Sequence, residues 1–113
     1  MPFSVPAQRL FGDILDAIHM IEEFTSGMDF EAFRCSAMAI AAVERKLQII
    51  SEAAVLLAGE AELHCPDQPW TDIRRLGDQL GDINDRIPLE NIWAIVKDKL
   101  PPLKASVLRA IIQ

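Results

Sequence analysis

The chain has 113 residues, half of them hydrophobic, which suits one domain with its own core and excludes a disordered chain. Seventeen acidic against eleven basic residues give a net charge of −6, which disfavours charge-driven binding to DNA or anionic lipid and leaves room only for a small local RNA site. No apolar run is long enough to span a membrane, and the start Met-Pro-Phe-Ser lacks a signal-peptide pattern. We expect a single cytoplasmic domain over residues 1–113, without a membrane partner.

The first expected helix begins near Ser4, whose hydroxyl can cap the chain ahead of Pro6. It runs to about Ser26 and Gly27. Apolar residues recur along it at steps of three and four, which places them on one helical face. The members of this buried stripe are Leu10, Ile14, Ala17, Ile21 and Phe24.

Candidate metal ligands and cysteines are sparse. His19 with Glu22 and Glu23 has the spacing of a helical metal pair, but bundle metal sites repeat such pairs on several helices and this sequence does not. We therefore expect a solvated acidic face and neither a metal nor a cofactor. Cys35 and Cys65 are too few for a disulfide scaffold, and we expect two reduced thiols.

The stretch from Asp29 to Gly59 predicts one continuous helix around which the chain is built. Asp29 can cap its start and Gly59 can end it, giving roughly 30 residues or ~45 Å. A short turn at Gly27 and Met28 would make this helix antiparallel to the first. Its buried stripe is Ile40, Val43, Leu47, Ile50, Ala54 and Leu57.

The rest of the chain continues the helical pattern. A polar loop over residues 60–69 contains His64, which we expect at the surface. A third helix is expected from Trp70 to Leu80, followed by a turn over residues 84–88. A fourth helix begins at Leu89. Pro101-Pro102 should break or kink it before a terminal segment over residues 103–112. No strand pattern competes. We predict an all-α fold, an antiparallel four-helix bundle with an extra C-terminal helix.

Short segments in a fixed order run through nearly the whole chain: Arg9-Leu10, Asp13-Ile14-Leu15, Ala17-Ile18, Ile21-Glu22-Glu23-Phe24, Gly27-Met28, Phe30, Ala42-Val43, Leu47, Ile49-Ile50, Glu52-Ala53-Ala54, Pro69-Trp70, Asp72-Ile73, Trp93 and Leu100-Pro101. Their order and spacing resemble the HepT-like branch of the HEPN superfamily, small helical proteins encoded beside a minimal nucleotidyltransferase. The resemblance implies a HEPN-like homodimer that acts as a metal-independent ribonuclease toxin. It also implies an antitoxin, the nucleotidyltransferase, which silences the toxin by adding AMP to a tyrosine.

The family's active motif is an arginine, four to six residues of spacer, a histidine, any residue, and the modified tyrosine. In the register set by the two tryptophans, Asp82 stands at the histidine position and Asn84 at the tyrosine position. Gly77 stands where the shortest spacer would place the arginine, while Arg75 satisfies the six-residue spacer. The resemblance thus assigns the degenerate catalytic positions to Arg75, Asp82 and Asn84.

These replacements change the chemistry. Metal-free RNA cleavage needs a group that titrates near neutral pH, which histidine does, whereas an aspartate with an ordinary pKa of ~3.9 is ionised at pH 7 and repels phosphate. Asn84 has no phenolic oxygen to accept AMP, and the chain contains no tyrosine. Arg74 and Arg75 are the best local candidates for phosphate binding, but paired arginines on an exposed helix are more often merely solvated, which is the expectation here.

Glu52 and Arg45 lie seven residues apart on one helical face. Either they form a surface pair, or Glu52, which matches a recurrent family position, contributes to the site.

Three functional hypotheses stay open. The first is a HepT-like toxin-side component whose RNA cleavage is lost or much reduced, with a nucleotidyltransferase antitoxin as partner and RNA as a weak one. The second is a catalytically inactive helical dimer that serves as an interaction module. The third is a nucleotide-binding bundle that supplies a separate nucleotidyltransferase. Whether the chain is an enzyme depends on what Asp82 and Asn84 do at the motif positions.

Overall fold

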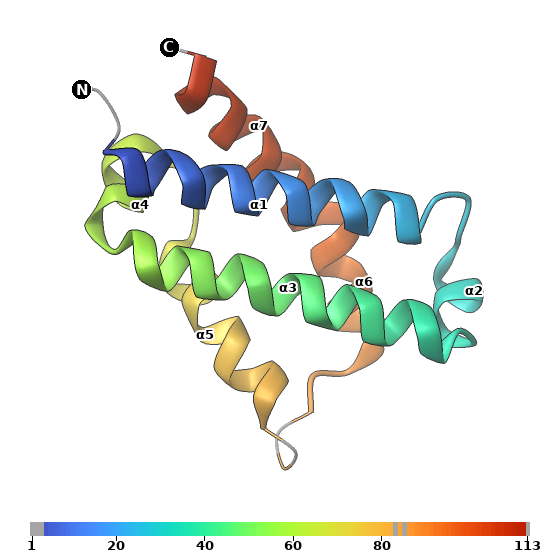
Figure 1. Cartoon of the computed structure of the whole chain (residues 1–113). Helices are drawn as coiled ribbons and strands as arrows, with labels where there is room; N and C mark the ends of the chain where they lie inside the picture. The colour runs from blue at the N-terminus through green and yellow to red at the C-terminus, as the bar shows by residue number, and fades with distance from the viewer. Residues whose placement is uncertain (1–3, 83, 85, 113) are drawn as a thin grey trace.

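The computed structural model describes residues 4–82, 84 and 86–112, and all regular structure within them is helical. Helix α1 (Val5–Phe24) lies antiparallel beside α3 (Ala37–Leu57), as Figure 1 shows. Helix α5 (Trp70–Gly81) packs against α3, and α7 (Leu100–Ile112) packs against α1. The predicted all-α fold is therefore confirmed. The first three residues, and Asp85 within the predicted turn over residues 84–88, lie outside the described part.

Side-chain caps start the helices of the first half of the chain. Ser4 accepts the Ala7 N–H at 3.1 Å and so caps α1, as its place before Pro6 predicts. Asp29 accepts the Ala32 N–H at 2.9 Å and begins α2, as predicted. A cap of this kind satisfies an amide that has no partner within the helix and contributes about 1 kcal/mol. Sequence reading locates such starts well because the cap and its amide are close neighbours.

The single helix predicted over residues 29–59 is wrong, because the chain breaks it twice. Helix α2 spans only Phe30–Arg34, and Ser36 leaves helical geometry (φ −112°, ψ 96°) to cap α3 through its hydroxyl. At the other end Ala58 turns the chain with φ 49° and ψ −133°, one residue before the predicted stop. Helix α4 (Gly59–His64) follows directly, so the loop expected over residues 60–69 shrinks to 65–69.

The prolines near the C-terminus do not interrupt the helical path. Helix α6 (Leu89–Ala94) continues into a π-helical segment, Ile95–Lys99, and then into α7. Pro101 and Pro102 lie in the first turn of α7, directly after the π-helical segment. The wider π turn, in which the Leu100 N–H donates to the Ile95 carbonyl, takes the place of the predicted break.

One apolar core joins all the long helices. The predicted stripe of α3 is buried, except that Ile40 is only partly so. Trp70 is 1% exposed, its ring meets the Phe11 ring edge-on, and its Nε1–H donates to the Cys65 carbonyl at 2.7 Å. His64 is half-buried against the edge of the Phe11 ring, so the expectation of a surface histidine is wrong. Among the described residues no helix is long and apolar enough to cross a membrane.

Candidate functional site at the end of α5

The helix that carries the motif positions is locked against α3 by one buried serine. The Ser51 hydroxyl donates to the Arg74 carbonyl and accepts the Gly77 N–H, both at 2.9 Å. A Cβ at position 77 would lie 2.6 Å from Ser51 Oγ, closer than real Cβ atoms approach other atoms. A side chain at position 77 would therefore displace the Ser51 hydroxyl from its two hydrogen bonds, which disfavours an arginine at the shortest-spacer position.

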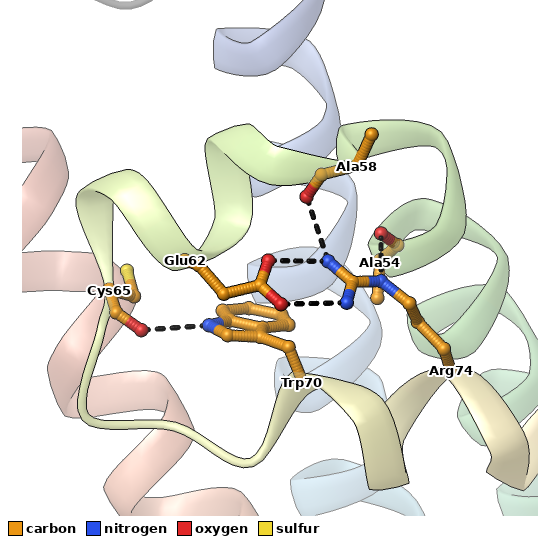
Figure 2. Close-up of polar contacts among 6 residues, drawn as sticks. All are labelled: Ala54, Ala58, Glu62, Cys65, Trp70 and Arg74. Atoms are coloured by element: carbon orange, nitrogen blue, oxygen red, sulfur yellow. Dashed lines mark hydrogen bonds and ion pairs between the residues drawn. The ribbon is translucent and has the colours of Figure 1, made fainter.

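Arg74 is engaged in structural contacts and is therefore neither merely solvated, as expected, nor well placed to bind phosphate. Figure 2 shows its guanidinium between α3, α4 and α5. It donates to the Ala54 carbonyl at 3.1 Å, to the Ala58 carbonyl at 2.7 Å, and to both oxygens of Glu62 at 2.7 and 2.8 Å. These bonds use four of its five N–H donors, and Glu62 neutralises its charge. They also hold the pKa of Glu62 below its usual range.

Two of the three degenerate motif positions, Asp82 and Asn84, lie at the far end of α5. Asp82 is the exposed C-cap of the helix, and its Oδ1 accepts the Asn84 N–H at 2.9 Å. Asn84 is exposed too. Arg75 lies seven residues before Asp82, on the same helical face and ~10 Å away along the axis. The structure thus brings Asp82 and Asn84 together, whereas Arg75 makes no hydrogen bond or ion pair with any described residue.

Two adjoining hollows border this end of α5. The first, of about 490 Å³, is lined by Asp82, by Glu44 from α3 and by Arg86. The second, of about 360 Å³, shares Arg86 with the first and also contains Lys99. Sequence reasoning missed both basic residues. The signal for Arg86 was its place directly after the motif, but Lys99 is thirteen residues further on and reaches the hollow only through the path of α6 and the π-helical segment.

The remaining candidates from the sequence are not part of this site. Arg45 and Glu52 form an exposed ion pair at 3.7 Å, which supports the surface-pair interpretation of that face. Glu22 pairs with Lys104 of α7 at 3.1 Å and so ties α1 to α7. No cluster of three potential metal-ligating side chains occurs among the residues that the structure describes.

Comparison with known proteins supplies the context for this geometry. Residues 14–110 match the family model described as "Ribonuclease HepT-like". The chain is 36% identical over 94 residues to a "Probable ribonuclease HepT" of Thermococcus cleftensis, covering 83% of this chain and 86% of that protein. It is 32% identical over 95 residues to a "Putative RNase" of Methanocaldococcus jannaschii, covering 84% and 87% of the two chains. No solved structure matches the chain.

Proposed function

We propose that this chain, which belongs to the Ribonuclease HepT-like family, is the toxin-side component of a cytoplasmic toxin-antitoxin pair whose RNA cleavage is lost or much reduced. One observation carries the proposal: Asp82, at the histidine position, is an exposed helix cap whose carboxylate accepts the Asn84 N–H. Metal-free cleavage needs a group that takes a proton from the 2′-hydroxyl and returns one to the leaving oxygen, and histidine suits both steps near neutral pH.

A cleavage assay tests this proposal. Purified tRNA and mRNA are incubated with the natural protein and with a D82H/N84Y variant, with metal chelated. The variant leaves Gly77 unchanged, because a side chain there would collide with Ser51, and uses Arg75 as the motif arginine. We expect no cleavage above buffer by the natural protein and measurable cleavage by the variant.

A matched control removes the chemistry but keeps the bulk. D82Q/N84F places side chains of similar size at the same positions without an imidazole or a phenol, and we expect it to be inactive. Circular dichroism must show that all three proteins are folded. Cleavage by the natural protein would contradict the loss of activity, and activity of the control would show that the new side chains do not act as the motif predicts.

The partner proposal follows from the missing tyrosine and from an exposed apolar surface. Because the chain has no tyrosine, AMP transfer to that residue is impossible, and an antitoxin nucleotidyltransferase would have to act by binding. Exposed large apolar side chains gather near the end of α3 and on α4: Val55 is 54%, Leu56 70% and Leu63 56% exposed. Such exposure is typical of association surfaces and supports the alternative of a homodimeric interaction module.

Light scattering on the chain alone, and then after mixing with the nucleotidyltransferase, tests this alternative. We expect a dimer mass at micromolar concentration and a larger complex in the mixture. L56E should weaken one of these assemblies, whereas the exposed polar substitution Q8E should leave both unchanged. A monomer that binds no nucleotidyltransferase would contradict the alternative.

A further inference from the structure

The hollow that contains Arg86 and Lys99 differs in charge from the other surface hollows. We call it the basic hollow; it is lined by Arg86, Lys99, Gln79, Asn91, Leu76 and Ile95 among others. None of its described lining residues is acidic. In a chain with a net charge of −6, this concentration of positive charge favours an anionic ligand.

Each of the neighbouring hollows carries carboxylates instead. The hollow that adjoins it contains Glu44 and Asp82, and the one between α3 and α5 contains Glu52 and Asp78. The hollow between α1 and α3 likewise contains two aspartates and a single lysine. Of these four described hollows, the basic hollow is the one suited to an anion.

Both basic groups of this hollow are available to a ligand. Arg86 and Lys99 are exposed, and neither forms a hydrogen bond or ion pair with a described residue. This contrasts with Arg74, whose guanidinium bonds to Glu62 and two carbonyls. An arginine and a lysine together are well suited to phosphate, since both donate charge-assisted hydrogen bonds to its oxygens.

The other lining groups suit a nucleobase. The side-chain amides of Gln79 and Asn91 both donate and accept hydrogen bonds, as the edges of bases require. Leu76 and Ile95 supply apolar surface for the face of a ring. The volume, about 360 Å³, lies within the usual range of roughly 300–1,000 Å³ for small-ligand pockets.

We propose that the basic hollow binds one nucleotide unit of single-stranded RNA, with its phosphate against Arg86 and Lys99. The basic hollow adjoins the hollow at the motif position, with which it shares Arg86 and Ile87. Glu44 and Asp82 in that second hollow would repel a second phosphate, so the assignment is limited to one nucleotide unit of the strand. The choice of RNA rests on the proposed function, whereas the anion site rests on the lining residues alone.

Fluorescence anisotropy with a short labelled single-stranded RNA, in chelator at about 50 mM salt, tests the assignment. The comparison is between the natural protein and R86Q/K99Q. We expect the variant to lose about tenfold or more in affinity at low salt. Its salt dependence should also become shallower, by about 0.7 in the log–log slope for each of the two lost phosphate contacts.

A matched control removes the same charge elsewhere. R9Q/K46Q lowers the net charge by the same two units on α1 and α3, and we expect its RNA affinity to stay within about twofold of the natural protein, because only direct phosphate contacts carry the salt-dependent binding. Thermal melting by circular dichroism confirms that both variants are folded. An equal loss of affinity in the control, or no RNA binding by the natural protein, would overturn the proposal.

Two further measurements separate a failure of the RNA-binding site from a failure of the proposed function. AMP and GMP are titrated in the same assay, and if either alone binds as tightly as the RNA, the ligand is a free nucleotide and the RNA assignment is wrong. The RNA is also run on a denaturing gel. Cleavage by the natural protein would overturn the proposed loss of activity and leave the binding site standing, whereas a natural protein that neither binds nor cleaves the RNA would overturn the site alone.

Discussion

The two ends of α5 differ in how they are held. At the anchored end, which we define as Trp70, Arg74 and Gly77, the side chains or backbone bond to α3, to α4 and to the loop after it. At the open end, defined as Asp82, Asn84 and Arg86, the one described hydrogen bond between side chain and backbone is that of Asp82 with its near neighbour. We therefore expect the fold to depend more on side chains at the start of α5 than on side chains at its end.

The largest expected effect is at Trp70. W70A removes a side chain that is 1% exposed, an edge contact with Phe11 and a hydrogen bond to Cys65, so we expect a loss of about 3–5 kcal/mol in the free energy of unfolding. Urea denaturation followed by circular dichroism measures it. The control is W93A, whose ring is partly exposed beside Phe33, and it should cost clearly less. Equal losses would contradict a special role for the anchored end.

Two glycines of α5 give the next comparison. G77A should destabilise by about 1–3 kcal/mol, because the new Cβ would lie 2.6 Å from Ser51 Oγ and force α5 away from α3. G81A meets nothing within 4 Å and should be neutral or stabilising by up to about 1 kcal/mol through helix propensity. Denaturant midpoints of the two variants measure these changes in stability. Opposite signs support the difference between the ends, whereas a stabilising G77A would refute the close contact.

Ala58 stores strain next to the anchored end. Its φ of 49° is in the left-handed region, and its carbonyl is held by Arg74 at 2.7 Å. A58G should therefore raise the free energy of unfolding by about 1 kcal/mol, since relief of strain exceeds the entropy that glycine adds to the unfolded chain. The control A41G, at an exposed interior position of α3, should lower stability by roughly 0.5–1 kcal/mol. Losses in both variants would show that Ala58 is unstrained.

The pH dependence of stability tests the pair of Arg74 and Glu62. The hydrogen bond from Arg74 lowers the pKa of Glu62, so its contribution to stability is present above the unfolded value of about 4.3 and is lost as pH falls through the lower folded pKa. We expect the stability of E62Q to fall less steeply with decreasing pH than that of the natural protein, as measured by urea midpoints from pH 6 downward. The control E44Q, whose carboxylate makes no described ion pair, should lose stability as steeply as the natural protein. Equal steepness in E62Q would contradict the assignment of this pH dependence to Arg74 and Glu62.

A feature of the fold could be predicted from the sequence where the interacting residues lie close together along the chain. The caps at Ser4 and Asp29 and the buried stripe of α3 were predictable, because each depends on residues within a few positions. The bond between Ser51 and Gly77 joins residues 26 apart, and periodicity carries no information about it. For the same reason nothing in the sequence indicated that Arg74 bonds to Ala54 of α3 and Glu62 of α4.

The residues of the candidate site likewise differ in whether the sequence could predict them. The motif positions Asp82 and Asn84 follow from spacing alone, and the structure places them side by side. The basic hollow does not, because Arg86 and Lys99 come together only after the chain has turned through α6. Ser36 shows the same limit for element boundaries, since nothing in the apolar pattern marked the break before α3, whereas the end of α3 at Ala58 lies one residue from the predicted stop.

The smallest expected effect is at the open end itself. D82A removes one exposed hydrogen bond to the Asn84 N–H, so we expect a change within about 0.5 kcal/mol in the free energy of unfolding, together with faster hydrogen exchange at the Asn84 amide. The control D29A removes a comparable bond at the start of α2 and should cost about 1 kcal/mol, because that carboxylate caps a helix. A cost at Asp82 as large as at Asp29 would mean that aspartate is retained there for structure. A negligible cost leaves the position open to chemistry, which is the condition under which D82H/N84Y can restore a motif without disturbing the fold.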